Sequence, residues 1–77
     1  MSITFVLINA APTSEHTVYN TLLREPEIIE LHPLFGEYDL IARIEAETSE
    51  KIGEIVTKKI RAIKGVIDTK TLTGTIF

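Results

Sequence analysis

The chain has 77 residues, no cysteine and a formal net charge of −3, which limits it to one small domain without disulfides or thiolate metal sites. The acidic balance argues against a nucleic-acid-binding surface, and no segment has the ~20 apolar residues of a membrane-spanning helix. Small domains without covalent links often gain stability by self-association. The N-terminus has no basic region typical of a signal peptide, so the expected location is the cytoplasm.

The first expected element is a strand over Ile3–Asn9. Both of its alternating faces are apolar, which is typical of a strand in the middle of a sheet that is covered on both sides. One face carries Ile3, Phe5 and Leu7, and the other carries Val6 and Ile8.

A helix is expected next, ending near Arg24. Thr13 or Ser14 is a suitable N-cap, because a hydroxyl can accept a hydrogen bond from a free N–H group of the first turn. Val18 and Leu22 lie four residues apart and form part of an apolar stripe.

The second strand is expected over Glu27–Phe35. Ile29, Leu31 and Phe35 alternate with Glu30 and His32, as is typical of a strand. Pro33 removes a backbone hydrogen-bond donor, so this strand is expected at an edge of the sheet.

Gly36 and Glu37 are expected to form a tight turn that leads into a third strand over Tyr38–Glu47. Leu40 and the residues alternating with it form its apolar face. The other face is mixed, and its members are Asp39, Ile41, Arg43, Glu45 and Glu47.

A second helix is expected to open at Thr48–Glu50, which again offers capping side chains, and to stop at Gly65. The strongest helical periodicity of the chain supports this helix. Its apolar stripe consists of Ile52, Ile55, Val56, Ile60 and Ile63. A last strand over Val66–Phe77 completes the chain.

The order β-α-β-β-α-β predicts an α+β, ferredoxin-like fold, in which an antiparallel four-stranded sheet carries two helices on one face. The first and third strands are then central, and the second and fourth are edges. The opposite face, with Val6, Ile8 and Ile41 as candidates, is left for a partner subunit, so we expect at least a homodimer.

The sequence offers few candidates for catalysis or metal binding. His16 and His32 lack a metal-ligand spacing, and Ser14 is better explained as a helix cap than as a nucleophile. Glu45 and Glu47 lie on one strand face and are expected to be solvated. We therefore predict no catalytic residue, no metal site and no cofactor.

Asp39 is unusual, because Asp is depleted in strands. One interpretation is a strand-edge charge that points to water or pairs with Arg43 on the same strand face. The other is a carboxylate beside a glycine turn, which suits a free amino acid: the turn offers N–H groups to its carboxylate and Asp39 accepts from its ammonium group. The residues alone leave both interpretations open.

Two stretches resemble the ligand-binding (RAM) domain of the Lrp/AsnC transcription factors. They are FGEYDLIARIEAET, which starts at Phe35, and IRAIKGVIDTKTL, which starts at Ile60. Within the second, Ile63, Gly65, Val66, Thr69 and Thr71 follow the pattern I-x-G-V-x-x-T-x-T. The resemblance covers essentially the whole chain, so residues 1–77 are expected to be a single effector-binding and oligomerisation domain, without the helix-turn-helix domain of full-length members.

The resemblance also implies a site. Gly36, Glu37 and Tyr38 would supply turn backbone, Asp39 would hold the α-amino group, and Thr69 and Thr71 would complete the pocket from another subunit. The family forms dimeric α+β barrels and rings of four dimers, so the expected partners are further copies, a free amino acid and a DNA-binding relative. The expected function is regulatory and not enzymatic. The alternative is a small monooxygenase-like α+β-barrel enzyme, for which His32 is the one candidate residue.

Overall fold

The computed structural model describes residues 2–73, so the expected continuation of the last strand to Phe77 lies outside the described residues. Four strands form one antiparallel sheet in the order β2-β3-β1-β4. Their bounds are Ser2–Ala10 for β1, Ile28–Pro33 for β2, Leu40–Ala46 for β3 and Val66–Thr73 for β4. The central positions of β1 and β3 and the edge positions of β2 and β4 confirm the prediction.

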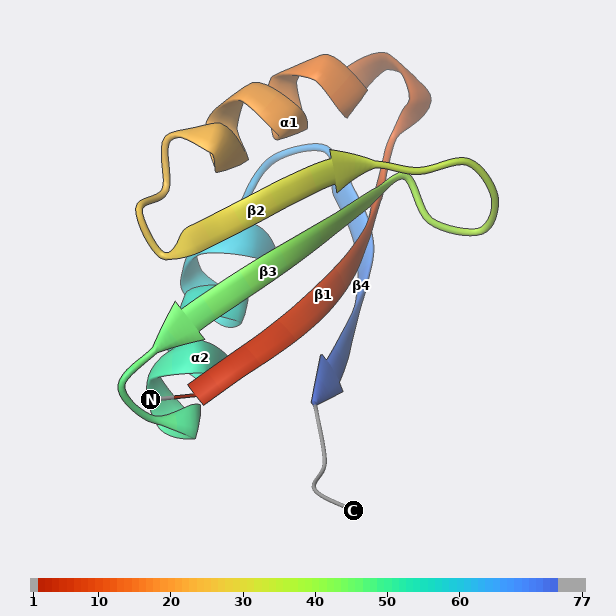
Figure 1. The fold of residues 1–77 in the computed structure, drawn as a ribbon. Helices are drawn as coiled ribbons and strands as arrows, with labels where there is room; N and C mark the ends of the chain where they lie inside the picture. The colour runs from red at the N-terminus through yellow and green to blue at the C-terminus, as the bar shows by residue number, and fades with distance from the viewer. Residues whose placement is uncertain (1, 74–77) are drawn as a thin grey trace.

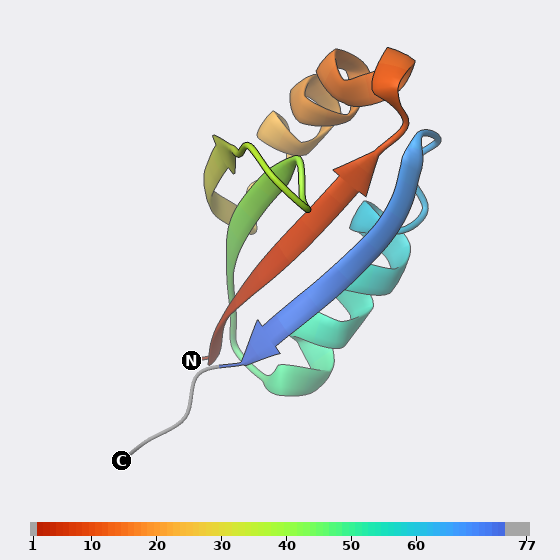
Figure 2. The ribbon, with the colours of Figure 1, turned by 90° about the vertical axis from the view of Figure 1, so that its right-hand side faces the viewer.

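Two helical segments connect the strands and cover one face of the sheet (Figures 1 and 2). A short 3-10 turn, η1 (Pro12–Ser14), leads into α1 (Glu15–Leu23). The second segment is α2 (Ser49–Ile55), which continues into a π-helical turn, η2 (Val56–Ile60). The ferredoxin-like β-α-β-β-α-β fold predicted from the sequence is therefore the observed one.

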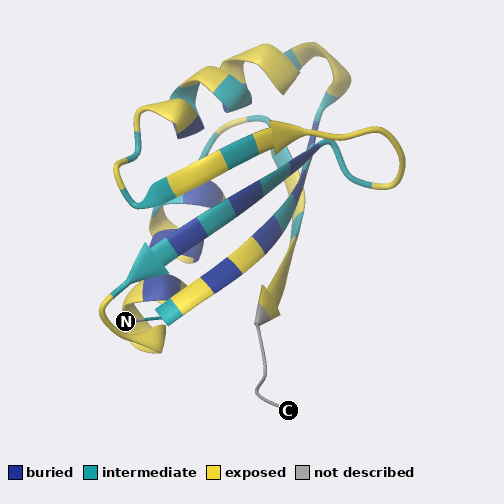
Figure 3. Ribbon diagram, in the orientation of Figure 1, coloured by how far each residue is buried: buried dark blue, intermediate teal, exposed yellow. Residues whose placement is uncertain are grey.

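The face of β1 that lies under the helices differs from the prediction. Val6 and Ile8 are fully buried, whereas Ile3 and Phe5 are exposed, as the alternating colours along β1 show (Figure 3). The expectation that Val6 and Ile8 lie on the free face is wrong, while Ile41 does lie there. Alternation defines two faces but not which one the helices cover, and both faces of β1 are apolar.

The core fills the space between the sheet and the helices. From the sheet it takes Val6, Ile8, Ala10, Leu40, Ala42 and Ile44, and from the helical segments Val18, Leu22, Ile52, Ile55, Val56 and Ile60. The predicted stripe of the second helix is confirmed at its four most buried positions, and Ile63 packs at the margin of this core.

A register shift in β2 changes which of its residues face the core. The pairing with β3 shifts between Ile28 and Glu30, so that Ile28 and Leu31 pack against the core and Ile29 is 51% exposed. A bulge adds one residue to a strand and reverses the alternation beyond it. Ile29 and Leu31, which alternate with polar residues in the sequence, therefore do not share the side of the sheet that faces the core.

The two helices begin differently. The side chain of Thr48 accepts a hydrogen bond from the Lys51 N–H group at 3.1 Å, as predicted for an N-cap. Ser14 occupies the N-cap position of α1, but its side chain makes no capping hydrogen bond. The helix ends at Leu23 with Arg24 as its C-cap, which confirms the predicted end.

Gly65 does not directly follow the second helix, because that segment ends at Ile60 with Arg61 as its C-cap. Gly65 has a φ of +106°, and its carbonyl accepts a hydrogen bond of 2.8 Å from the Ala11 N–H group. A Cβ atom at this position would lie 2.6 Å from the Cβ atom of Ser14. A glycine is thus required at position 65, both because its φ is positive and because Ser14 lies too close for a side chain there.

Candidate functional site

The loop between β2 and β3 carries four of the six predicted site residues. It spans residues 34–39 and projects beyond the sheet (Figure 1), so it is longer than the expected two-residue turn. The Leu34 N–H group donates to the Asp39 carbonyl at 2.8 Å and closes the base of the loop. Gly36 has a φ of +116°, a conformation in which glycine has no steric cost.

Asp39 is bonded to β1 and not to Arg43. Its backbone N–H group donates to the Ile8 carbonyl at 2.9 Å, and its Oδ2 atom accepts from the Ala10 N–H group at 2.8 Å. Arg43 instead donates to Glu30 at 2.7 Å and also to Glu45. The interpretation of Asp39 as a partner of Arg43 is therefore wrong, and the carboxylate holds the loop to the end of β1.

A hollow of about 420 Å³ lies beside Asp39, between the β2–β3 loop and α1; we call it the loop hollow. Gly36, Glu37 and Tyr38 do not line it. Its lining residues are Ala10, Glu15, His16, Tyr19, Pro33, Leu34, Phe35, Asp39 and Leu40. The presence of Tyr19 in this lining could not be predicted from the sequence, because its position depends on how α1 packs on the sheet.

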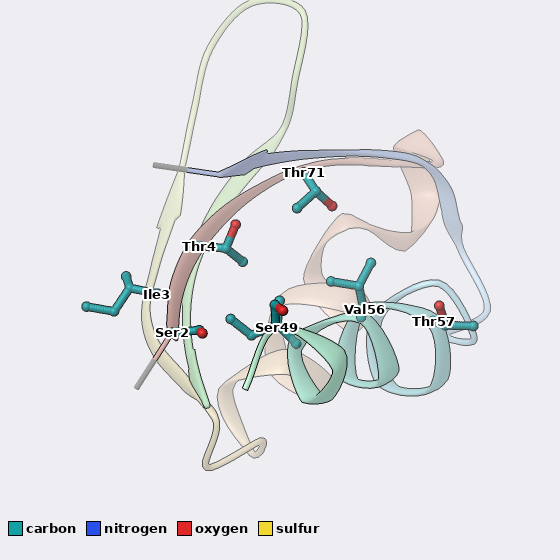
Figure 4. A pocket seen from close by; sticks show the side chains of 9 residues that line it. Ser2, Ile3, Thr4, Ser49, Val56, Thr57 and Thr71 are labelled. Carbon is teal, nitrogen blue, oxygen red and sulfur yellow. The ribbon is translucent and has the colours of Figure 1, made fainter. Parts of the chain in front are cut away.

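Thr69 and Thr71 lie on β4, paired with Ile8 and Val6 of β1. Because Ile8 and Val6 face the helices, the two threonines share the helix-covered side of the sheet. Thr71 lines a second hollow of about 450 Å³ between the sheet and α2, which we call the helix hollow. Its side chain and that of Thr4 point toward the helix there (Figure 4).

A single chain does not bring Asp39 together with the two threonines. In the sheet, Ile8 pairs with Leu40 on one side and with Thr69 on the other. Two strand spacings, roughly 10 Å, therefore separate the end of β3 from Thr69. Asp39 and Thr71 moreover line different hollows.

The sheet face away from the helices carries a cluster of charges, which we call the open-face cluster: Glu30, His32, Arg43 and Glu45. The guanidinium group of Arg43 is the main cause that lowers the pKa of Glu30, and His32, whose Nε2 atom lies 3.2 Å from Glu30 Oε1, contributes next. His32 is an exposed residue of this face and not part of an apolar pocket, which the enzyme alternative would require.

Residues 2–73 contain no group of three His, Cys, Asp or Glu side chains placed to hold a metal ion. Within the same residues, no helix is long and apolar enough to cross a membrane.

Far from the loop, Lys59 bridges Glu25 and Glu27, and its hydrogen bond is the main cause that lowers the pKa of Glu27.

The sheet with one uncovered face and two helical segments on the other defines a small ferredoxin-like α+β domain. Residues 3–73 match the model of the Lrp/AsnC ligand binding domain. The chain belongs to this family, as its sequence predicted.

Relatives and solved structures agree with this assignment. An uncharacterized HTH-type transcriptional regulator of Pyrococcus horikoshii, PH1916, is 38% identical over 71 residues, which cover 88% of this chain and 47% of the relative. The crystal structure of FFRP-DM1 is 33% identical, has a TM-score of 0.93 and is covered over 100% of its length by 97% of this chain. The chain thus spans about half the length of the curated relative, but all of FFRP-DM1.

A more distant structure shares the fold. The transcriptional regulator NMB0573 of Neisseria meningitidis, solved as a complex with L-Met, is 16% identical with a TM-score of 0.87. The similarity covers 97% of this chain and 50% of the regulator. This similarity shows the shared fold alone. The regulatory assignment of the chain rests on the Lrp/AsnC family model and on its named relatives, which are transcriptional regulators.

Proposed function

We propose that the domain senses a free amino acid at the β2–β3 loop and tunes transcriptional regulation through its state of assembly. The observation that carries the proposal is the carboxylate of Asp39, fixed beside a loop whose Gly36 has a positive φ. A fixed carboxylate and a run of backbone N–H groups are the two features that complement an α-amino acid.

The hydrogen bonds of the loop leave suitable groups for both ends of the ligand. Oδ2 of Asp39 is engaged by the Ala10 N–H group, which orients the carboxylate so that Oδ1 accepts from the ligand's ammonium group. Within residues 2–73, the loop's backbone hydrogen bonds start from the N–H groups of Leu34 and Asp39. The N–H groups of Gly36, Glu37 and Tyr38 are then donors for the ligand's carboxylate.

Membership of a family whose domain is described as ligand-binding supports this proposal. The complex of NMB0573 with L-Met supports it further, because that regulator shares the fold and its crystals contain an amino acid. For this chain, the amino-acid effector itself is part of the proposal.

Assembly is the second part of the proposal. The open face of the sheet exposes Ile3, Phe5 and Leu72, and pairing of two such faces in a dimeric α+β barrel would bury them. Thr69 and Thr71 would then contribute to the effector site of a neighbouring subunit in an assembly of dimers. A DNA-binding relative of the same family is the proposed regulatory partner, and residues 1–77 act as one effector-binding and oligomerisation domain.

The substitution Asp39→Asn tests the site. Asn keeps an oxygen that can accept from the Ala10 N–H group, so folding should be preserved, but the charge that attracts an ammonium group is lost. We expect affinity for the bound amino acid to fall by about 1.5–3 kcal/mol, roughly ten- to a hundredfold. Isothermal titration calorimetry, preceded by a thermal-shift screen of the common amino acids, measures this loss.

Glu37→Gln is the matched control, because it removes a carboxylate from the same loop and keeps the backbone. Its affinity should equal that of the unmodified chain. If the unmodified chain, Asp39→Asn and Glu37→Gln bind the amino acid with equal affinity, Asp39 does not contact the ligand. A screen in which no amino acid raises the melting temperature would leave a module that assembles without an effector.

A further inference from the structure

We propose that the amino acid held by Asp39 has a large apolar side chain, which fills the loop hollow. This inference rests on the proposed function, because it uses the same carboxylate as the anchor for the ammonium group. It goes further by assigning the chemical class of the ligand from the surface that its side chain would meet.

The walls of the loop hollow are mostly carbon. Tyr19 of α1 forms one side and Leu34 of the loop another, and the remaining apolar residues of the lining are Ala10, Pro33, Phe35 and Leu40. The volume of about 420 Å³ falls within the ~300–1,000 Å³ that is usual for small-molecule sites. Asp39 belongs to the same lining, so a ligand anchored there has its side chain directed along an apolar surface.

Phe35 lies at the rim of the hollow and is 107% exposed. A fully exposed aromatic ring in a small domain is free to gain burial when a ligand arrives. The neighbouring Leu34 is also exposed. An apolar ligand side chain between Tyr19 and Phe35 would remove both rings from water, whereas an empty hollow leaves them hydrated.

The polar residues of the lining do not favour a polar side chain. Glu15 and His16 are exposed and belong to the first turn of α1. Glu15 is already explained by the positive end of that helix. An amide side chain placed against Tyr19 and Leu34 would lose hydrogen bonds to water without a buried partner in exchange. A basic side chain that reaches Glu15 is the alternative that the experiment must separate.

The experiment is isothermal titration calorimetry of the full chain with L-leucine, L-phenylalanine, L-alanine, L-asparagine and L-lysine. Each buried methylene group changes affinity about fourfold. We therefore expect leucine and phenylalanine to bind at least tenfold more tightly than alanine and than the two polar amino acids.

Phe35→Ala identifies the contact with the side chain. It should weaken leucine binding at least threefold and leave alanine binding unchanged, and it cannot disturb the core because Phe35 is fully exposed. Leu23→Ala is the matched control, since Leu23 is an exposed apolar residue of α1 outside the hollow. It should change neither affinity.

The two proposals fail in different ways. If no amino acid binds, both the effector function and this inference are wrong. If asparagine or lysine binds more tightly than leucine, the inference alone is wrong, and loss of lysine binding in Glu15→Gln would assign a basic ligand instead. Equal weakening of leucine and alanine in Phe35→Ala would also overturn it, because the ring would then act on the loop and not on the side chain.

Discussion

Both faces of β1 carry apolar residues, but the two faces of the sheet have different surroundings. On β1, Val6 and Ile8 lie under the helices without exposure, whereas Phe5, their neighbour in sequence, is 42% exposed on the open face. The covered face packs mainly against apolar side chains of the helices, while the open face combines its apolar residues with the open-face cluster. The covered face therefore holds the chain together, whereas the open face leaves apolar residues in contact with water.

The largest effect is expected where a charge enters the covered layer. Ile55 of α2 is almost fully buried in the core. Ile55→Asp would place a carboxylate there without a partner, which should cost several kcal/mol and unfold much of the population at 25 °C. Urea denaturation followed by circular dichroism measures the loss, and unchanged stability would show that Ile55 does not face the core.

A second substitution tests the close approach between Gly65 and Ser14. Gly65→Ala forces a side chain into a left-handed conformation and against Ser14, so stability should fall by about 1–3 kcal/mol. Gly53→Ala is the matched control, because a Cβ atom at Gly53 meets nothing within 4 Å. It should raise stability by about 0.5–1 kcal/mol. Equal effects of both alanines in urea denaturation would contradict the assigned close approach.

A substitution on the open face should weaken self-association without lowering the stability of the fold. Phe5→Thr keeps a strand-forming residue but removes a ring from the proposed dimer interface. Loss of its burial should weaken self-association by about 2 kcal/mol, roughly thirtyfold in the dissociation constant. Sedimentation measured over a concentration series gives this constant, and Leu23→Ala serves as the control. A monomeric mass of the unmodified chain at micromolar concentration would show that the open face is not a dimer interface.

The smallest effect is the dependence of stability on acid. The pKa values of Glu27 and Glu30 are lowered from an ordinary value of 4.5, mainly by their hydrogen bonds to Lys59 and Arg43. Their contribution is present above pH 4.5 and is lost as the pH falls through the lowered folded-state values. Urea denaturation over a pH series should show this decline.

Two variants separate the contributions of Glu27 and Glu30 to this loss of stability at acidic pH. Lys59→Met should flatten it at every protein concentration, because Lys59 and Glu27 join η2 to the start of β2 within one chain. Arg43→Gln should flatten it more strongly at concentrations at which the dimer forms, because a partner would exclude water from the open-face cluster. An identical response at all concentrations would indicate that the cluster stays solvated.

Most of the fold was predictable because its signals are local. The apolar run of β1, the proline of β2 and the stripe of α2 each determine one element, and the order of elements then indicates the sheet topology. The features that were missed depend on contacts between distant segments. The covered face of β1 is decided by its register with β3, and the bulge beside Ile29 by pairing with the same strand.

The candidate site shows the same limit. The loop around Gly36 and Asp39 was marked by its composition and by the family resemblance. The hydrogen bond from Ala10 to Asp39 joins residues 29 positions apart, and Tyr19 reaches the loop hollow only through the packing of α1. Neither contact has a local pattern in the sequence, so no inspection of short segments would have found it.

The bulge in β2 has a consequence for how copies of this domain can associate. An edge strand with unpaired N–H and C=O groups is a template on which a foreign strand can add, and continued addition leads to aggregates. The irregular register near Ile29 and the missing donor of Pro33 interrupt that template within six residues of strand. Growth of the sheet from the β2 edge is thereby opposed, whereas the pairing of open faces proposed above does not use this edge.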